Sequence, residues 1–371
     1  MNKKIKAALL ASTALLGSIS VAHSQLTISG YTELSYISGG YKQAGGATGA
    51  QTTTPTGGTG TALTTTNDIQ KQVGSEVSLR FTNKHNLSGP MAGYYAQAMA
   101  EIRRIGNGFE EQSVTFGPTN NAFVLFIEKD VVRGIEHARN VYPTVNNRVG
   151  DIIGAGTGVV DPLDASSTIG NFGVAIPNLG GGMFSINFAP NMGGSVNTAT
   201  NNSDGNANKG TVITEGQKRY SVGYRNSNIK LAGGTVDIGV GYLGGTQPKA
   251  NFIDPKSRTL GVTYRTGPFA AGIQRFRNEN PAAVSGNSDT QLTYGITFAA
   301  TKEISIGAAM TRQEGQQAGV KDPDDITAKT FQAAYNMGPA VFQLDYQLVS
   351  NANYVSGQDM APVKAKFKVN F

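Results

Sequence analysis

The chain has 371 residues and contains neither cysteine nor tryptophan, which excludes disulfides, thiol chemistry and most zinc sites. The formal net charge is +6. Three of these charges belong to an N-terminal segment that we expect to be removed, and the remaining 6 − 3 = +3 is too small and too dispersed to indicate nucleic-acid binding. A helical membrane protein is also excluded, because no apolar run of about 20 residues follows residue 24.

The first 24 residues have the pattern of a secretory signal. Lys3, Lys4 and Lys6 form a basic start, residues 7–19 form a short apolar core, and an Ala-His-Ser tripeptide over 22–24 is a small-x-small cleavage site. The apolar core is too short for a membrane anchor. We therefore expect residues 1–24 to be cleaved after export and residues 25–371 to form a single domain.

From residue 26 onward, apolar and polar residues alternate in short segments. This period of two predicts β-strands that have one apolar face and one polar face. The stretch over 38–68 is rich in Gly, Thr and Ala and predicts a long loop. In the first part of the chain, the predicted strands cover residues 26–36, 73–82, 91–103, 110–117 and 122–128.

Residues 129–167 interrupt this regularity. The first dozen of them have helical spacing, and the rest mix Gly and Pro breakers with acidic and basic residues. A structureless excursion of this length is uncommon unless it has a function.

Regular hairpins follow, beginning with two strands around a turn predicted over 177–182 and ending with a loop over 350–361 and a last strand. In that last strand, Lys364, Lys366 and Lys368 face one way, whereas Phe367 and Phe371 face the other.

The whole pattern amounts to about sixteen strands, with short turns alternating with long polar loops. It predicts an all-β fold, a transmembrane antiparallel barrel with an apolar outer face, a wet inner face and no free edge. Short strands at similar spacing also occur in soluble sandwiches. Those do not require the strict alternation of short and long connections, so the barrel is favoured.

Three stretches resemble the Gram-negative general porins. The run Gly-Ser-Glu-Val-Ser-Leu-Arg-Phe over 74–81, followed by 94–101, is similar to the second and third strands of that family. Residues 172–189 resemble its sixth and seventh strands, and the final strand with Phe371 resembles its last strand and terminal aromatic residue. A family arginine of the second strand aligns with Ser78, and Arg80 lies two positions further on the same face.

The resemblance implies a trimer of sixteen-stranded barrels with long extracellular loops, short periplasmic turns and a water-filled pore narrowed by an inward-folded third loop, here 129–167. It implies passive diffusion of ions and small hydrophilic solutes, without catalysis or a cofactor, across the outer membrane. Its partners would be outer-membrane lipid and lipopolysaccharide and the barrel-assembly machinery, which would read Phe371. The implied constriction carboxylates are Asp130, Glu136, Asp151, Asp161 and Asp164. The basic wall candidates are Arg80, Arg103, Arg225, Lys364, Lys366 and Lys368.

The residues also leave alternatives open. The charge pattern leads to a hypothesis of weak selectivity with a slight preference for anions. An outer-membrane barrel enzyme of the protease or lipase kind, a substrate-specific surface-binding barrel and a soluble secreted binding protein are the other classes. His85 and His137 have no recognisable nucleophile partner, however. The glycines at 239, 241 and 244 match a dinucleotide fingerprint only formally, because no helix follows. The acidic run over 322–325 could hold a divalent cation, but acidic loops are usually only solvated.

Overall fold

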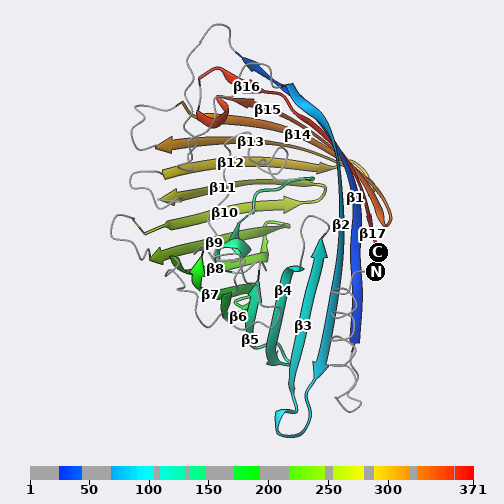
Figure 1. The fold of residues 1–371 in the computed structure, drawn as a ribbon, viewed down its shortest axis with the longest axis vertical. Coiled ribbons are helices and arrows are strands. Elements are labelled where there is room, and N and C mark those ends of the chain that lie inside the picture. Colours follow the sequence, from blue (N-terminus) through cyan, green and yellow to red (C-terminus); the bar gives the residue numbers. More distant parts are fainter. Residues whose placement is uncertain are drawn as a thin grey trace, which may run out of the picture.

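A single closed antiparallel sheet contains almost all of the secondary structure of the described residues (Figure 1). The computed structural model describes residues 25–43, 68–103, 109–129, 134–139, 141–146, 171–192, 217–246, 254–279, 288–316, 324–354 and 356–371. The sheet closes because the first long strand pairs with both the second and the last. Each long strand therefore has a hydrogen-bonded neighbour on both sides. The expected signal segment, 1–24, lies outside the described residues.

Sixteen long strands form the barrel wall, which confirms the predicted architecture, and β16 is a short additional strand that pairs with β1 and β15. The strands are β1 (Gln25–Gln43), β2 (Asp68–Asn86), β3 (Tyr94–Arg103), β4 (Phe109–Pro118), β5 (Val124–Lys129), β6 (Asn171–Leu179), β7 (Gly182–Met192), β8 (Gln217–Leu231), β9 (Gly234–Thr246), β10 (Lys256–Thr266), β11 (Phe269–Glu279), β12 (Ser288–Ala299), β13 (Ile304–Gln316), β14 (Ile326–Met337), β15 (Ala340–Ser350), β16 (Gln358–Met360) and β17 (Val363–Asn370).

In the part of the chain that the structure describes, the helical elements are short: η1 (Gly89–Met91), α2 (Ile135–Ala138) and η5 (Ala352–Tyr354). Within the described ranges, no helix has the length and hydrophobicity needed to cross a membrane.

The connections differ in length between the two rims of the barrel. Two-residue turns at 180–181, 232–233, 267–268 and 338–339 join neighbouring strands on one rim. At 232–233 both residues have positive φ, 45° for Ala232 and 77° for Gly233, which is the backbone twist that tight hairpins require. The longer connections, including 130–170 and 193–216, leave from the other rim. The predicted alternation of short and long connections is therefore confirmed from β5 to β15, whereas β3 and β4 are joined on the long-connection rim by only five residues.

Several predicted boundaries are corrected by the structure. The strand β1 continues to Gln43, so the first long connection is shorter than the predicted loop over 38–68. The turn predicted over 177–182 is wrong in its bounds, because β6 runs through Pro177 and the turn is 180–181. Proline is tolerated there since the register shifts between Ile176 and Leu179, which releases its backbone from the ladder. The predicted loop over 350–361 contains η5 and β16.

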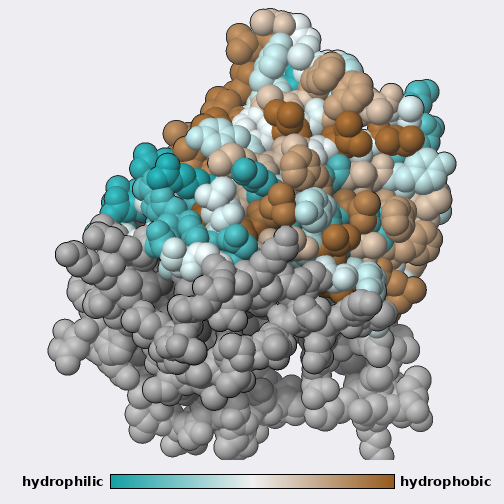
Figure 2. All heavy atoms as spheres, turned by 90° about the horizontal axis from the view of Figure 1, so that it is seen from above, coloured by the Kyte–Doolittle hydropathy of each residue, from teal (hydrophilic) through white to brown (hydrophobic). Residues whose placement is uncertain are grey.

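The two faces of the wall have opposite polarity. Large apolar side chains are exposed on the outside, for example Ile127 at 68% and Ile296 at 60%, whereas Ser185, Thr263 and Gln313 are fully buried on the inside. A soluble protein has the reverse arrangement. Figure 2 shows the consequence among the coloured residues of one view, where hydrophobic side chains cover much of the surface and the most hydrophilic ones gather mainly on one side.

Candidate functional site

A segment between β5 and β6 lies inside the barrel, against its polar face. Its backbone amides donate hydrogen bonds to wall side chains: Gly134 N to Ser185 Oγ at 2.8 Å, Val141 N to Gln274 Oε1 at 3.2 Å and Val145 N to Gln332 Oε1 at 3.0 Å. These acceptors belong to β7, β11 and β14, so the segment crosses most of one side of the interior. We call residues 134–139 and 141–146 the inner segment.

The far end of the inner segment is also fixed to the wall. Asn146 Nδ2 donates to the Ala333 carbonyl oxygen at 2.8 Å and to Asp345 Oδ1 at 3.1 Å. The wall residues therefore replace, through their side chains and carbonyls, the partners that an irregular backbone would otherwise find in water. The predicted inward fold of the third loop is correct for this part of it.

A row of glycines makes room for the inner segment. A Cβ built on Gly261 would lie 2.7 Å from Val141 Cβ, and one built on Gly295 would lie 2.5 Å from the Pro143 carbonyl oxygen. Such distances are too short for any side chain, so the segment can lie this close to the wall only where the wall residue is glycine. We call these residues the glycine track: Gly223, Gly239, Gly241, Gly261, Gly272, Gly295 and Gly307.

Sequence reasoning missed the glycine track. It interpreted the glycines at 239 and 241 as ordinary strand residues, and both do lie in β9. The available signal was that glycine recurs at inward positions on the consecutive strands β8 to β13. In a strand, such glycines indicate a close approach of another backbone.

A second internal contact comes from the connection between β15 and β17. Tyr354 of η5 donates its phenol hydrogen to Asp289 Oδ1 at 2.5 Å and accepts a hydrogen bond from Gln313 Nε2 at 2.6 Å. Burial and the nearby Asp289 carboxylate raise the pKa of Tyr354, so the phenol stays protonated and remains a donor. Tyr354 and Tyr142 of the inner segment belong to one buried apolar cluster, so the cluster links the two internal segments.

We expect the substitution Tyr354→Phe to destabilise the barrel by about 1–3 kcal/mol, because it leaves the buried Asp289 carboxylate without its donor. Urea unfolding of the refolded protein in detergent micelles measures this loss. Tyr335→Phe, at an exposed position on β14, is the matched control and should unfold like the unmodified chain. Equal stability of the two variants would contradict the role given to the Tyr354 hydroxyl.

Charged side chains gather on the inner face of β2 to β4. Arg80 Nε donates to Glu101 Oε2 at 2.9 Å, and a terminal nitrogen of the same guanidinium lies 2.7 Å from Glu111 Oε2. Ser78 Oγ donates to the other oxygen of Glu101 at 2.7 Å. A single guanidinium thus bridges two carboxylates, of which Glu101 is only 1% exposed.

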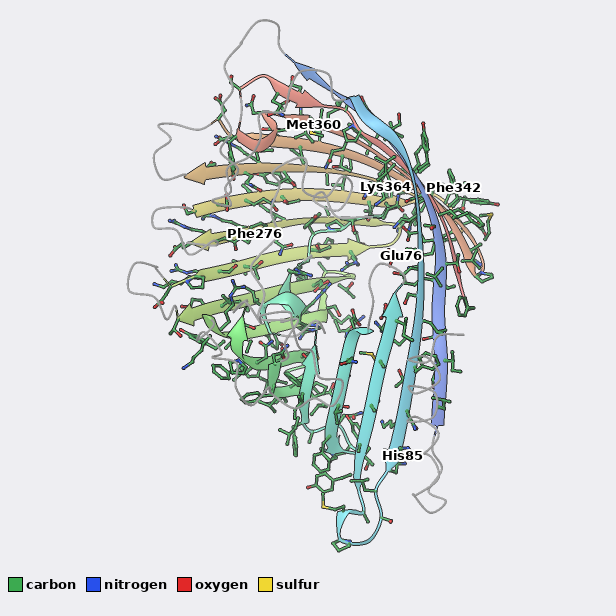
Figure 3. The ribbon with its side chains drawn as sticks, in the orientation of Figure 1. Glu76, His85, Phe276, Phe342, Met360 and Lys364 are labelled. Carbon is green, nitrogen blue, oxygen red and sulfur yellow. The ribbon has the colours of Figure 1, made fainter. Side chains whose placement is uncertain are left out.

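A second charged group lines the seam where β1, β2 and β17 meet; Figure 3 labels Glu76 and Lys364 in this region. Lys366 Nζ lies 3.3 Å from Glu33 Oε2, and Lys368 Nζ lies 3.7 Å from the centre of the Tyr31 ring. The Tyr31 hydroxyl in turn donates to Glu76. The pairing of β17 with β15 places Lys364 opposite Asp345, which binds the inner segment, so this face of β17 is the interior one.

Close to the short turns, Arg225 and Arg265 share one carboxylate. Arg225 makes two hydrogen bonds to Asp237, at 3.1 and 2.7 Å, and Arg265 lies 3.4 Å from the same side chain. Arg225, Arg80 and the three lysines of β17 therefore all face the interior.

The other predicted site residues cannot all be placed. Arg103 ends β3 and Glu136 lies in α2, but their side chains are not among those described. Asp130, Asp151, Asp161 and Asp164 lie outside the described residues. The terminal Phe371 exchanges two backbone hydrogen bonds with Gly30, at 2.9 and 3.0 Å, and its ring is exposed.

The wall carboxylates were missed, because sequence reasoning placed the acidic groups only in the third loop. The signal for four of them was present: Glu33, Glu76, Glu101 and Glu111 occupy polar-face positions of strands that were predicted or partly predicted. Only the register shows that Arg80 and Glu101 are direct neighbours.

The candidates for other chemistry are distributed as follows. His85 lies in β2 and His137 in α2. Asp325 accepts two hydrogen bonds from Arg312, at 2.9 and 2.6 Å, while Asp322 lies outside the described residues. In the part of the chain that the structure describes, no group of three or more His, Cys, Asp or Glu residues is placed to hold a metal ion.

Porins are among the solved structures that are similar to this chain. The anion-selective porin from Comamonas acidovorans has a TM-score of 0.56 at 14% sequence identity, with 94% of this chain and 100% of that chain covered. A triple mutant of Rhodopseudomonas blastica porin has a TM-score of 0.55 at 11% identity, with the same coverage of both chains. The fold is that of the porins. No family model and no curated protein matches the sequence.

Proposed function

We propose that this protein is an outer-membrane porin, a water-filled channel for passive diffusion of ions and small hydrophilic solutes. The observation that carries the proposal is the inverted polarity of a closed barrel: Ile127 and Ile296 are exposed outside, while Arg80 and Lys366 face the inside. Lipid would surround the outer face, and solute-bearing water would occupy the interior. The porin fold of the similar structures supports this use of the barrel.

The pore passes along the charged side of the interior. The inner segment covers the wall from β7 to β14, whereas the ion pairs of Arg80 and Lys366 lie on β1 to β4 and β17. A transverse field between opposite charges would sort solutes by size, charge and dipole. We propose that the third-loop carboxylates (Asp130, Glu136, Asp151, Asp161 and Asp164) form the acidic side of the constriction and that Arg80, Arg103, Arg225 and the lysines of β17 supply the basic side.

The proposed selectivity is weak, with a slight preference for anions. Wall carboxylates offset much of the positive charge, since Glu101 and Glu111 flank Arg80 and Glu33 lies beside Lys366. The porin from Comamonas acidovorans is described as anion-selective.

Planar-bilayer recording of the detergent-purified protein tests the function. We expect stepwise insertion of ohmic channels, and a reversal potential close to zero under a KCl gradient. A strong cation preference would reject the proposed anion preference. The absence of conductance would reject the proposed channel function. A barrel enzyme would instead hydrolyse peptide or ester substrates, and a soluble binding protein would stay dispersed without detergent.

Phe371 is proposed as the signal read by the barrel-assembly machinery. Deletion of Phe371 removes its two backbone hydrogen bonds with Gly30 and leaves the polar residue Asn370 at the C-terminus. We expect the amount of protein in the outer-membrane fraction to fall about tenfold or more, whereas the deleted chain should still refold in detergent because the other seam pairs remain. An unchanged amount of protein in the outer-membrane fraction would contradict the proposed role of Phe371 as an assembly signal. Failure of the deleted chain to refold in detergent would instead indicate a structural role for Phe371.

We further propose that three copies form a homotrimer in the outer membrane. The exposed apolar side chains of β1 to β5, among them Ile28, Ile102 and Ile127, provide a surface that a second barrel could cover. Chemical cross-linking of the protein in native membranes tests the proposed trimer. We expect cross-linked dimers and trimers, and the detection of monomer alone would reject the proposal.

A further inference from the structure

A cavity of about 270 Å³ lies inside the barrel, between the inner segment and the rim with the short turns. Thr144 and Val145 of the inner segment border it on one side, and Pro268, in the short turn between β10 and β11, borders it on another. The remaining lining comes from β12 to β15, which are neighbouring strands of the sheet (Figure 1). We call this space the rim cavity.

Small side chains on the wall create the rim cavity. The register places four residues in one row across β12 to β15: Ala299, Ser305, Ala334 and Gln343. The row faces the interior, because Ala334 lies two residues from Gln332, which binds Val145 N at 3.0 Å. The wall and the inner segment therefore touch at Gln332. At the level of the row, alanine and serine leave the space between them open.

The polar side chains that line the rim cavity have no partner within the protein. They come from the inner segment and from all four strands: Thr144, Thr297, Ser305, Asn336 and Gln343. Within the described part of the chain, none of these five side chains makes a hydrogen bond to another protein group, and the amide oxygen of Gln343 lacks a donor. Elsewhere on the wall, Gln274 and Gln332 accept hydrogen bonds from the inner segment. The hydrogen-bonding capacity of the rim cavity thus remains for a bound molecule.

The rim cavity is also neutral. None of the described residues that line it is Asp, Glu, Lys or Arg. The cations that border it belong to β17, and both have contacts away from the cavity: Lys366 Nζ lies 3.3 Å from Glu33, and Lys368 lies over the Tyr31 ring. An ion that entered the cavity would lose part of its hydration without gaining a counter-charge, which is unfavourable. A neutral molecule would not have this cost.

The size and chemistry of the rim cavity suit a single polyhydroxylated ring. Water takes about 30 Å³ per molecule in the liquid, so the cavity has room for about nine waters or one small ring. Hydroxyl and amide side chains both donate and accept hydrogen bonds, and so do the hydroxyl groups of a sugar. Val145 and Val341 add apolar surface, against which the C–H groups of such a ring can pack.

We propose that the rim cavity is a binding site for a neutral monosaccharide. The ring hydroxyls bind the side chains of Thr297, Asn336 and Gln343, and the carbon face lies against Val145 and Val341. The site rests on the proposed function in one respect, since the sugar reaches it through the water-filled interior. It lies on β12 to β15, away from the Arg80 ion pairs of β2 to β4, so ions and neutral solutes meet different parts of the wall.

Binding of D-glucose to the full-length protein in non-ionic detergent, measured by saturation-transfer NMR, tests the site. The variant T297V/Q343M keeps the shape of two lining side chains and removes their hydrogen bonds, so the affinity for glucose should fall about tenfold or more. The matched control T82V/Q97M makes the same two changes on the inner faces of β2 and β3 and should bind glucose like the unmodified protein. The variant A299L keeps every polar group but fills the cavity from its exposed edge, and should also lose binding.

A second ligand tests the neutral character of the rim cavity. D-Glucuronate has the same ring with one carboxylate, and should bind about fivefold or more weakly than glucose because no lining cation compensates its charge. Equal or tighter binding of glucuronate would overturn the neutral class. Equal binding of glucose by T297V/Q343M, or by A299L, would show that the sugar does not occupy the cavity.

Channel conductance, recorded in planar bilayers from the same samples, separates this site from the proposed function. An unmodified protein that conducts but does not bind glucose would overturn the sugar site alone. An unmodified protein that binds glucose but does not conduct would reject the channel alone. We expect the unmodified protein to do both, and T297V/Q343M to conduct without binding glucose.

Discussion

The substitution Gly295→Val should lower the single-channel conductance by about half, because it forces the inner segment away from the wall and into the passage. The Pro143 carbonyl oxygen and the Tyr142 ring lie 2.5 and 3.3 Å from the position of the new Cβ. The strand itself tolerates valine well, so the strain falls on the segment. Planar-bilayer recording in symmetric KCl measures the effect.

The matched control is Ala271→Val, which adds a similar volume on the outward face of neighbouring β11, at an exposed position. It should leave the conductance unchanged. If Gly295→Val also conducts like the unmodified protein, the inner segment does not border the passage. If the conductance of Gly295→Val rises, the inner segment has left the interior. That result would show that the segment, when it lies on the glycine track, narrows the pore.

Replacing Arg80 with glutamine should shift the selectivity towards cations by about fivefold, since one charge at about 4 Å in water contributes ~1 kcal/mol. The change leaves Glu101 and Glu111 without the guanidinium that bridges them. The reversal potential under a KCl gradient reports the shift. The same variant should lose about 2 kcal/mol of stability, because the buried Glu101 carboxylate loses the guanidinium that donates to it, while its hydrogen bond from Ser78 remains.

The control for this variant is Arg312→Gln. It removes the same charge from an exposed arginine on β13 that pairs with Asp325. Its reversal potential should match that of the unmodified channel. A shift in both variants would show that the net charge of the protein, rather than the position of Arg80, sets the selectivity.

The barrel was predictable from the sequence because lipid faces one side of each strand and water faces the other, which requires apolar and polar residues to alternate. Lys366 and Phe367 alternate for this reason, and the structure places them on opposite faces. The same pattern cannot provide the register, since each strand can slide by two residues without changing faces. The ion pairs of Arg80 depend on that register, so the sequence indicated a charged wall without indicating which charges are neighbours.

The path of the inner segment could not be predicted, because its backbone is irregular and its partners are distant in the chain. Val145 binds Gln332, and Val141 binds Gln274, across long separations in sequence. Only the glycines of the track carry a trace of this contact. A single glycine in a strand has many explanations, and only a series of them on adjacent strands indicates a second backbone.

The pairing of β1 with β17 determines the order in which this molecule can be assembled. Tyr31 lies opposite Asn370, so the wall cannot become a cylinder until the last residues have been synthesised and exported. A chain that ends early would keep two unpaired strand edges and would be prone to aggregate, which makes completion of the C-terminus the committing step of maturation.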